Sequence, residues 1–502
     1  MGVEQTLQRF KDYVREMGKL GAATALLHWD QRTYIPPKGH QGRAEVIGKL
    51  AKMAFEMLIS PEMAEFIAEL DRPEVKENLN EQDRAMVRVL AREHRRRKAI
   101  PPELYEQFVV TTSQAQTVWE RARKESNFEA FRPWLEKIVD FARQFAELIG
   151  YEENPYDALI EEFEPGMTAR QLNEIIEQLR KRLVPFVREL TERGQRPRTD
   201  FLRGKFPIEK QRELTLRALK AMGYDLEAGR QDTSAHPFTI TVGPGDVRIT
   251  TRFSEDDLLS ALFGSIHEGG HALYDQGIAP ELRWTGLDEG ASMGLHESQS
   301  RLWENLVGRS RPFWEFFYLQ LQELFPEFKG VPLDDFYRAV NLVEPSFIRV
   351  EADEVTYNLH IMLRFELEEG LVNKRIEVQD LPELWNTAMK NYLGIVPPDD
   401  AQGVLQDVHW SAGMIGYFPS YMLGNLYAAQ IFDTAKRELP GLEEQIARGE
   451  LLPLRDWLRE KIHRHGRIYE PEELLKRVTG EGPNPEHFLN YIHMKFSEVY
   501  RL

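Results

Sequence analysis

The stretch SEDDLLSALFGSIHEGGHALYDQG, residues 254–277, determines the fold of the region around it. Its apolar residues recur at intervals of three and four, which is the period of an amphipathic helix. Ser254 with Asp257 three residues later is typical of a helix start, and Gly277 is typical of a helix end. We therefore predict one helix that Ser254 caps and that runs to about Gln276.

Two strand-like runs come directly before this helix. Residues 238–242 (FTITV) and 247–253 (VRITTRF) alternate and are rich in β-branched side chains, and the residues GPGD (243–246) separate them. This pattern predicts a β-hairpin with a four-residue turn. Elsewhere helical periodicity dominates, as after the capping box of Thr168 and Gln171. The predicted fold class is therefore mainly α, with one small β-sheet.

The composition of the 502-residue chain excludes several classes of function. With 64 Lys+Arg against 81 Asp+Glu, its formal net charge is −17, which argues against a general nucleic-acid binder. The chain has no cysteine, which excludes disulfides, iron–sulfur clusters, Cys-ligated zinc and thiol nucleophiles. Length alone suggests about three domains, but no linker or composition break divides the chain.

Neither a secretion signal nor a membrane span is expected. The N-terminus lacks the basic flank and apolar core of a signal peptide. The longest stretch without Asp, Glu, Lys or Arg is residues 408–432, but it contains Pro419, three glycines and several polar side chains. We interpret it as a pair of buried helices rather than a membrane span. We expect a soluble, cytoplasmic protein.

The predicted central helix contains His267-Glu268-Gly269-Gly270-His271. Residues i and i+4 lie on one helical face, so both imidazoles can bind one metal ion. Glu268 lies about 100° around the helix, from where its carboxylate can reach a water in the open coordination position, as in zinc peptidases. Each glycine costs about 1 kcal/mol in a helix interior. The pair therefore indicates either close approach of another backbone or of the substrate, or simple tight helix packing.

A catalytic zinc site needs a third protein ligand. The stretch 286–301 begins with a polar loop and opens a further amphipathic helix, and it contains three candidates: Glu289, His296 and Glu297. Two histidines with one glutamate form an established catalytic zinc set. Spacing alone does not separate His296 from Glu297.

The chain resembles the zinc metallocarboxypeptidases of the carboxypeptidase Taq type. The resemblance covers nearly the whole length and rests on motif blocks in the family's order. These blocks are Leu27-His-Trp-Asp-Gln31, His236-Pro-Phe238, Asp246-Val-Arg-Ile-Thr250, the metal-binding helix, His296-Glu-Ser-Gln-Ser-Arg301, Ile348-Arg-Val-Glu-Ala-Asp353, Gly403-Val-Leu-Gln-Asp-Val-His-Trp410 and Thr479-Gly-Glu-Gly-Pro-Asn-Pro485. Several blocks in order are more specific than the HEXXH motif alone.

The resemblance implies metal ligands His267, His271 and Glu297, with Glu268 as the general base. It implies one zinc ion per chain, which cobalt could replace. The implied fold is a mainly α, gluzincin-like catalytic domain over residues 1–502, with two helical lobes, a deep central groove and the small sheet beside the metal. The resemblance also implies a homodimer that releases single amino acids from free peptide C-termini with broad specificity. No nucleic-acid or membrane partner is expected.

The uncharged stretch 408–432 supplies candidates for stabilising the tetrahedral oxyanion, which needs donors besides the metal. They are His409, Tyr417 and Tyr421. By resemblance His409 and Tyr421 are favoured. The alternative for each is a packed, hydrogen-bonded core residue.

A carboxypeptidase must also recognise a free α-carboxylate, which arginine does best through two parallel hydrogen bonds. Arg349 and Arg248 lie in motif blocks and are the candidates. Each could instead be a structural ion-pair partner, and Asp353 and Asp246 are plausible partners of that kind.

Two further side chains are open to two interpretations. His236 precedes Pro237 and either lines the groove or ends a loop. Asp275 follows His271 by four residues, so it either orients a ligand or is a surface carboxylate.

Two other functions compete with a carboxypeptidase. An oligopeptidase that cuts internal bonds shares HEXXH and the downstream glutamate. A catalytically silent helical binding protein would keep a structural zinc. Glu268 argues against the latter, because a structural site needs no base and usually fills all four positions with protein ligands.

Overall fold

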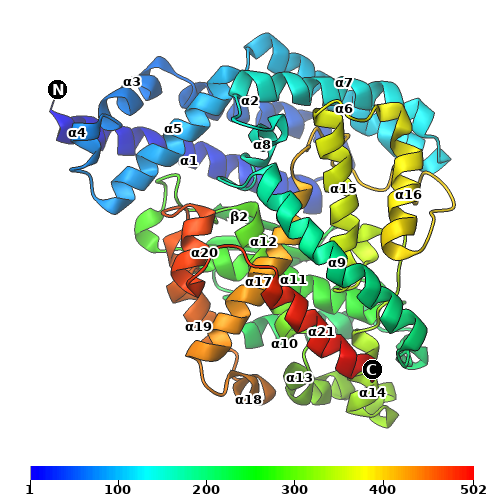
Figure 1. Ribbon diagram of the computed structural model, residues 1–502. Helices are drawn as coiled ribbons and strands as arrows, with labels where there is room; N and C mark the ends of the chain where they lie inside the picture. The colour runs from blue at the N-terminus through cyan, green and yellow to red at the C-terminus, as the bar shows by residue number, and fades with distance from the viewer. Residues whose placement is uncertain (1) are drawn as a thin grey trace.

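The computed structural model describes residues 2–502, most of them in helices (Figure 1). The first five helices form the N-terminal lobe: α1 Val3–Thr33, α2 His40–Leu58, α3 Pro61–Leu70, α4 Pro73–Lys76 and α5 Glu81–Ala99. This lobe has an apolar core of its own, to which Phe10, Phe66 and Leu90 belong. Leu282 and Leu287, from the connection that follows α11, complete that core.

The other helices pack around a larger core whose buried residues run from Ala115 to Tyr500. In chain order they are α6 Pro102–Glu125, α7 Phe128–Ile149, α8 Pro155–Ile160, α9 Ala169–Arg193, α10 Ile208–Met222, α11 Leu258–Gly277, α12 Met293–Arg301, α13 Arg311–Leu324, α14 Leu333–Val340, α15 Tyr357–Val372, α16 Leu381–Leu393, α17 Phe418–Glu438, α18 Leu442–Ala447, α19 Leu452–Lys461, α20 Pro471–Thr479 and α21 Glu486–Tyr500. The predicted capping box of Thr168 and Gln171 is present and starts α9. α11, α12 and α17 lie beside one another in the middle of the molecule (Figure 1).

The predicted hairpin is part of a three-stranded sheet. β2 (Thr239–Gly243) pairs antiparallel with β3 (Asp246–Thr251), and β1 (Gln231–Thr233) pairs parallel with the other side of β3. β2 is therefore an edge strand. β1 is short and polar, so it carries no alternating apolar pattern from which the sequence could have predicted it.

The prediction of a four-residue turn in the hairpin is wrong. Gly243 pairs with Asp246, so only Pro244 and Gly245 form the turn. Gly245 adopts φ +78°, a left-handed conformation that glycine accepts without a steric cost.

Helix α11 begins later than predicted, at Leu258. Its N-cap is Asp257 and not Ser254: the Asp257 carboxylate accepts a hydrogen bond of 3.0 Å from the backbone N–H of Ser260. Ser254 instead pairs with Asp257 in an isolated β-bridge. An aspartate is as good an N-cap as a serine, and here it stands directly before the apolar face begins.

The uncharged stretch 408–432 contains the start of one helix, not the predicted pair. α17 begins at Phe418 with Pro419 in its first turn, where proline is tolerated. The residues before it form turns in which Gly413 and Gly416 have positive φ. Among residues 2–502, no helix combines the length and the hydrophobicity that crossing a membrane requires.

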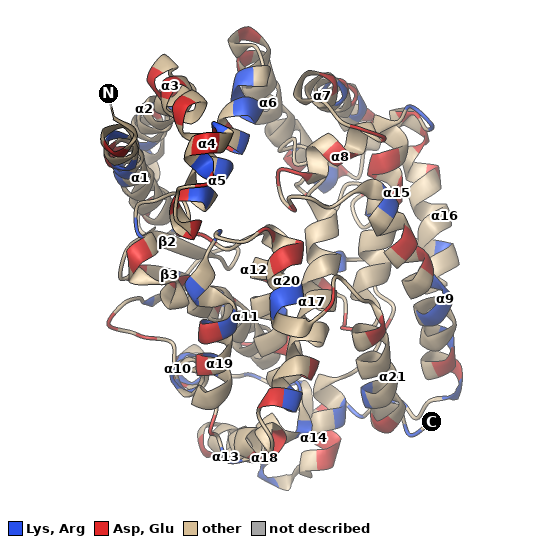
Figure 2. Ribbon diagram, turned by 60° about the vertical axis from the view of Figure 1, so that its left-hand side comes forward, with Lys and Arg blue, Asp and Glu red and all other residues tan. Residues whose placement is uncertain are grey.

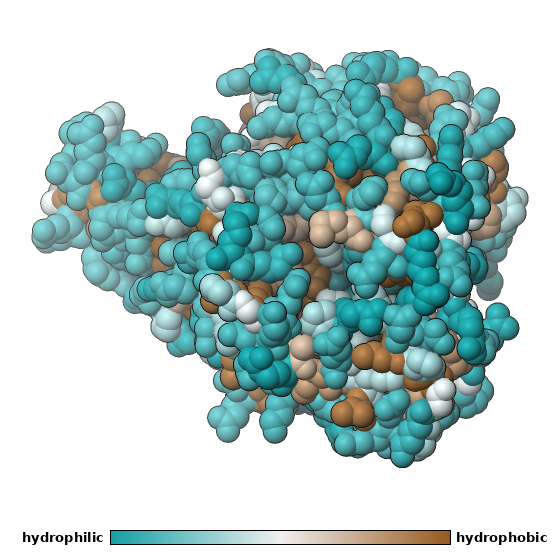
Figure 3. All heavy atoms as spheres, turned by 60° about the horizontal axis from the view of Figure 1, so that its bottom comes forward, coloured by the Kyte–Doolittle hydropathy of each residue, from teal (hydrophilic) through white to brown (hydrophobic). Residues whose placement is uncertain are grey.

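Charged side chains are spread over the outer helices. Figure 2 shows acidic and basic residues interspersed along them, often one turn apart, as in the pair of Arg477 and Glu473. The face in Figure 3 is mainly hydrophilic, with its apolar residues in small separate groups. Exposed ion pairs contribute little stability each, so the two apolar cores supply most of it.

Candidate active site

Two glycines let the central helices approach closely. A Cβ atom on Gly270 of α11 would lie 2.6 Å from the carbonyl oxygen of Gln299 and 2.7 Å from Ser300 Cα, both in the backbone of α12. A Cβ atom on Gly424 of α17 would collide with the side chain of Glu297. The position of Glu297 is therefore set by the packing of α12 against both neighbouring helices.

The sequence left two explanations for Gly269 and Gly270, close approach of another backbone or of the substrate, and tight helix packing. Each explanation applies to one of the two glycines. At Gly270 another backbone approaches closely. Gly269 instead packs tightly against a side chain, since a Cβ there would lie 2.6 Å from Leu219 Cδ2.

Gly270→Ala is expected to lower the free energy of unfolding by about 1–3 kcal/mol, because an added methyl group overpacks the contact with α12. Gly264→Ala is the matched control on the same helix. A Cβ atom at Gly264 meets no atom within 4 Å, and alanine favours a helix by about 1 kcal/mol over glycine. Denaturant unfolding measures both variants, and equal stability of the two would contradict the packing argument.

Three side chains of α11 and α12 converge on one point. His267 Nε2 lies 3.7 Å and His271 Nε2 lies 3.4 Å from Glu297 Oε2, and the three candidate ligand atoms all lie within 4.8 Å of one another. Two ligand atoms at about 2.1 Å from a tetrahedral ion are about 3.4 Å apart. The donor set and its spacing therefore fit a divalent metal ion.

The partners of these three side chains hold them in place. His267 Nδ1 lies 2.8 Å from Glu304 Oε2. Arg301 donates to Glu297 Oε1 at 2.8 Å and to Glu304 Oε2 at 3.1 Å. Burial acts to raise the pKa of the Glu297 carboxyl, but the charges of Arg301 and His267 and the bond to His271 outweigh it and hold that pKa well below its usual range. Glu297 is therefore an anion at neutral pH, as a metal ligand must be.

His296 and Glu289, the other candidates for the third ligand, lie outside this group of ligand atoms. His296 lies between His271, 2.6 Å away, and Asp275, 3.0 Å away. The Glu289 side chain is 73% exposed and forms an ion pair with Arg467.

Glu268 is buried and is directed at the hairpin. Its Oε2 accepts a hydrogen bond of 2.6 Å from Thr239 Oγ1, and the same hydroxyl lies 3.0 Å from the backbone carbonyl of Glu268. Thr239 belongs to β2, so the edge strand of the sheet fixes the orientation of this carboxylate beside the ligand set.

Arg349 is buried against Asp407. Its Nε and Nη2 donate to Asp407 Oδ1 at 3.0 and 2.8 Å, and its Nη1 donates to the Tyr357 hydroxyl at 2.9 Å. Burial lowers the pKa of Arg349, but the Asp407 charge outweighs it, so the guanidinium stays charged. Asp353 is not the partner of Arg349: it accepts backbone N–H groups of the turn that follows it.

His409 and Tyr421 contact each other near Glu297. His409 Nε2 lies 3.1 Å from the Tyr421 hydroxyl, and the Tyr417 and Tyr421 rings lie 5.1 Å apart. Tyr421 comes three residues before Gly424, which packs against Glu297, so both lie on one face of α17. Burial lowers the pKa of His409 to about 4. Its imidazole is therefore neutral at pH 7.

Arg248 and His236 lie at the sheet. Arg248 donates two hydrogen bonds to Asp246, at 2.7 and 2.6 Å, and its guanidinium carbon lies 4.4 Å from the centre of the Trp29 ring. These are the contacts expected of a structural ion pair. His236 is exposed in the loop before β2, where its backbone carbonyl accepts a hydrogen bond from Ser234.

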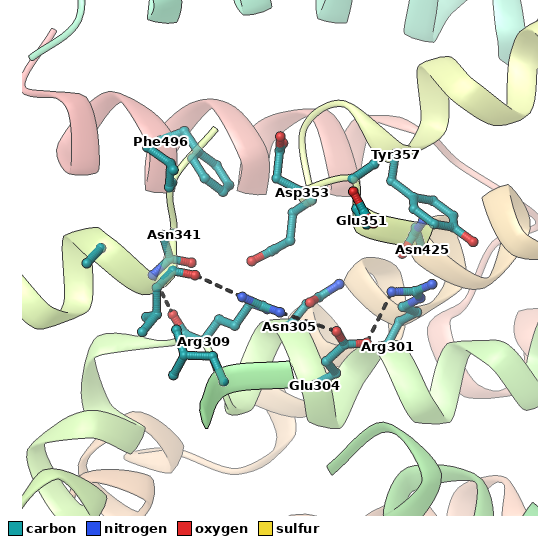
Figure 4. Close-up of a pocket in the computed structure, with 16 residues that line it drawn as sticks. Arg301, Glu304, Asn305, Arg309, Asn341, Glu351, Asp353, Tyr357, Asn425 and Phe496 are labelled. Carbon is teal, nitrogen blue, oxygen red and sulfur yellow. Dashed lines mark hydrogen bonds and ion pairs between the residues drawn. The ribbon is translucent and has the colours of Figure 1, made fainter. Parts of the chain in front are cut away.

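A polar cavity of about 210 Å³ adjoins the partners of the metal ligands. Figure 4 shows Arg309, Asn305, Glu304 and Arg301 along one wall and Tyr357 on another. The remaining lining residues that carry polar side chains are Asn341, Glu351, Asp353, Glu354 and Asn425. The wall of the cavity therefore carries positive, negative and amide side chains, and it lies next to the side chains that hold His267 and Glu297.

Four residues with a part in this site do not stand out in the sequence. Glu304 is seven residues after Glu297, a spacing that places both on one helical face, and could have been found that way. Asp407 precedes His409 by two residues in a motif block. Thr239 and Tyr357 carry no local signal, because their partners are distant in the chain.

Comparisons with known proteins agree over the whole chain. The family model described as "Carboxypeptidase Taq (M32) metallopeptidase" matches residues 9–496. The chain is 44% identical to Carboxypeptidase 1 of Bacillus subtilis, over 99% of each protein, and 44% identical to Thermostable carboxypeptidase 1 of Thermus thermophilus, over 100% of each. It also superposes on a carboxypeptidase structure from Pyrococcus furiosus with a TM-score of 0.95 at 41% identity, over 98% of this chain and 99% of the other.

Proposed function

Because the chain belongs to the carboxypeptidase Taq (M32) metallopeptidase family and is thus a metallocarboxypeptidase, we propose that it uses one zinc ion, with Glu268 as general base, to release single amino acids from free peptide C-termini with broad specificity. The observation that carries this proposal is the convergence of His267, His271 and Glu297, with Glu268 fixed beside them.

The donor set supports zinc as the metal. His267 and His271 face the common point with Nε2, Glu297 is anionic, and three protein ligands leave a fourth position open, as catalytic zinc sites require. A zinc ion bound there would polarise the scissile carbonyl and lower the pKa of a water to about 7. Cobalt has similar ligand preferences and could replace it.

Glu268 carries the proton in the proposed reaction. Its carboxylate takes a proton from the attacking water as the oxygen bonds to the carbonyl carbon. It then gives that proton to the amine nitrogen as the C–N bond breaks. The hydrogen bond from Thr239 supports this role, because it fixes one carboxylate oxygen and so orients the other.

Arg349 is the proposed binder of the substrate's terminal carboxylate. Asp407 and Tyr357 take three of its five N–H donors, one each on Nε, Nη1 and Nη2. One donor remains on Nη1 and one on Nη2, and such a parallel pair suits a bidentate carboxylate. Asp407 positions the guanidinium and balances its charge. Arg248 and His236 are the secondary proposals for substrate contact.

His409 and Tyr421 are proposed to stabilise the oxyanion. A neutral imidazole and a phenol can each donate a hydrogen bond to developing negative charge. Burial, followed by neighbouring charges that include Glu297, raises the pKa of Tyr421 well above its usual value. The phenol therefore keeps its proton and remains a donor throughout the neutral range.

The polar cavity is proposed to receive the side chain of the C-terminal residue. Arg301 and Glu304 in its wall touch the metal ligands, and Tyr357 touches Arg349. The C-terminal residue is bonded through its nitrogen to the scissile carbonyl at the metal, and its carboxylate lies on Arg349, so it must lie between these side chains. At about 30 Å³ per water, 210 Å³ holds several waters. Its size and mixed charge support broad specificity.

Mass spectrometry of an N-blocked peptide tests the proposal. We expect a ladder that loses one C-terminal residue per step, because the enzyme binds the free carboxylate next to the metal. A chelator is expected to abolish the ladder, and added zinc to restore it, because the reaction needs the ion held by His267, His271 and Glu297. Internal fragments in place of the ladder, or a ladder that survives chelation, would contradict the proposal.

The same peptide with an amidated C-terminus separates this activity from that of an oligopeptidase, which shares HEXXH and the downstream glutamate. Slow cleavage of the amide supports a carboxypeptidase. Rapid cleavage of the amidated peptide would favour an oligopeptidase that cuts internal bonds.

We infer a cytoplasmic homodimer from the family resemblance alone. Sedimentation analysis tests the oligomer, which is expected to have twice the mass of one chain.

A further inference from the structure

We propose that His296 and Asp275 are positioning residues that fix which nitrogen of His271 faces the metal. Together with Thr241 they form the Thr241–Asp275–His296 relay, which joins the edge strand β2 to a ligand of the metal. The inference rests on the proposed metal site and adds to it a cause for the orientation of one ligand.

The relay is continuous from the strand to the ligand. Thr241 Oγ1 donates to Asp275 Oδ2 at 2.6 Å, and Asp275 Oδ1 lies 3.0 Å from His296 Nε2. His296 Nδ1 in turn lies 2.6 Å from His271 Nδ1. The side chains of His296 and Asp275 are only 20% and 13% exposed, so water competes little for the contacts of His296 with Asp275 and His271. Each separation is within hydrogen-bonding range.

A neutral imidazole carries one N–H proton, so the nitrogen that holds this proton is the donor in each contact of the relay. His271 directs Nε2 towards Glu297 and the metal position, and a neutral imidazole that binds a metal through Nε2 carries its proton on Nδ1. His296 Nδ1 must therefore accept that proton, because two N–H groups cannot face each other at 2.6 Å. The proton of His296 then lies on Nε2 and is donated to Asp275, whose carboxylate can only accept.

Packing holds the His296 ring in this orientation. A Cβ atom on Gly290 would lie 2.8 Å from His296 Cδ2, so a residue without a side chain makes room for the ring. The Tyr274 ring lies 5.1 Å away, centre to centre. His296 is thereby wedged beside His271 and acts on the metal through it.

His267, the other histidine ligand, is held by a carboxylate without an intervening imidazole. His267 Nδ1 contacts the Glu304 carboxylate directly, whereas the relay inserts an imidazole between Asp275 and His271. Loss of His296 removes the acceptor of the His271 proton, and loss of Asp275 removes the partner that keeps the His296 proton on Nε2. Both changes leave the His267–Glu304 contact intact. The effect should therefore appear as weakened metal binding by a folded protein.

His296→Phe and Asp275→Ala test the relay. The zinc dissociation constant, measured by competition with a chromophoric chelator, is expected to rise by about 10- to 100-fold in both. The visible absorption bands of the cobalt-loaded variants are expected to shift, because the orientation of one ligand changes. Tyr274→Phe is the matched control: it keeps the ring beside His296 and loses only the hydroxyl that accepts from the Ala291 N–H. Its zinc affinity should equal that of the wild type.

Wild-type zinc affinity and an unchanged cobalt spectrum in folded His296→Phe would overturn the relay, even with the wild-type enzyme shortening peptides as proposed. A wild-type protein that neither binds zinc nor shortens peptides would instead overturn the proposed function. Circular dichroism establishes that each variant is folded. If His296→Phe does not fold, Asp275→Ala decides the question by the same two measurements.

Discussion

Glu268→Gln is expected to lower kcat by about 10²- to 10⁴-fold, the usual contribution of a general acid–base group. The glutamine amide can still accept the hydrogen bond from Thr239, so the side chain keeps its place. It cannot take a proton from water at neutral pH. Initial rates on an N-blocked peptide with zinc in excess measure the loss, and a chelator competition on the same sample should show wild-type zinc affinity.

Glu281→Gln makes the same chemical change at an exposed site that follows α11 and should leave the rate unchanged. Thr239→Val removes only the hydroxyl that orients Glu268, so its rate should fall between those of the wild type and Glu268→Gln. Undiminished hydrolysis by Glu268→Gln would show that another group takes the proton.

Arg349→Lys is expected to lower kcat/KM by about 10- to 150-fold for peptides with a free C-terminus. This range follows from about 1.5–3 kcal/mol for hydrogen bonds to a charged group. Lysine keeps the positive charge beside Asp407 but cannot offer the parallel donor pair. Steady-state kinetics should place most of the loss in KM. The slow cleavage of the amidated peptide should not change, because it has no carboxylate to recognise.

Arg364→Lys is the matched control, since Arg364 is fully buried and pairs with the other oxygen of Asp407. It should lower stability while leaving the preference for a free C-terminus intact. Equal loss on the free and amidated peptides in Arg349→Lys would show that Arg349 supports the fold and does not bind the carboxylate. Arg349→Ala is less informative, because it leaves a buried Asp407 short of a partner, at a cost of about 3–5 kcal/mol.

Local spacing was enough to predict part of the site. The four-residue interval between His267 and His271, and the hairpin before them, needed no knowledge of the rest of the chain. His296 and Glu297 could not be separated, because they are neighbours on one helix. What distinguishes them is the packing of α12 against Gly270 and Gly424, which depends on the whole fold.

Most of the contacts that the sequence did not indicate join residues that are distant in the chain. Arg349 and Asp407 are 58 positions apart, and no local pattern links them. The sequence suggested Asp353 as the partner because it is near in the same motif, yet Asp353 serves its own turn. The hairpin and helix α11 were both predicted correctly as elements. Only the length of the hairpin turn and the first residue of α11 were wrong. There a cap closer to the apolar face, Asp257, and a tighter glycine turn decided the outcome.

The N-terminal lobe has a consequence for how the enzyme unfolds. Ala279, Leu282 and Leu287, which lie between the helix of the two histidines and the helix of Glu297, are buried in the core of α1–α5. If those five helices melted, the connection that sets the separation of the two ligand helices would lose its apolar cover. Heat should therefore abolish metal binding and the structure of the N-terminal lobe in one cooperative step, although no proposed ligand belongs to that lobe.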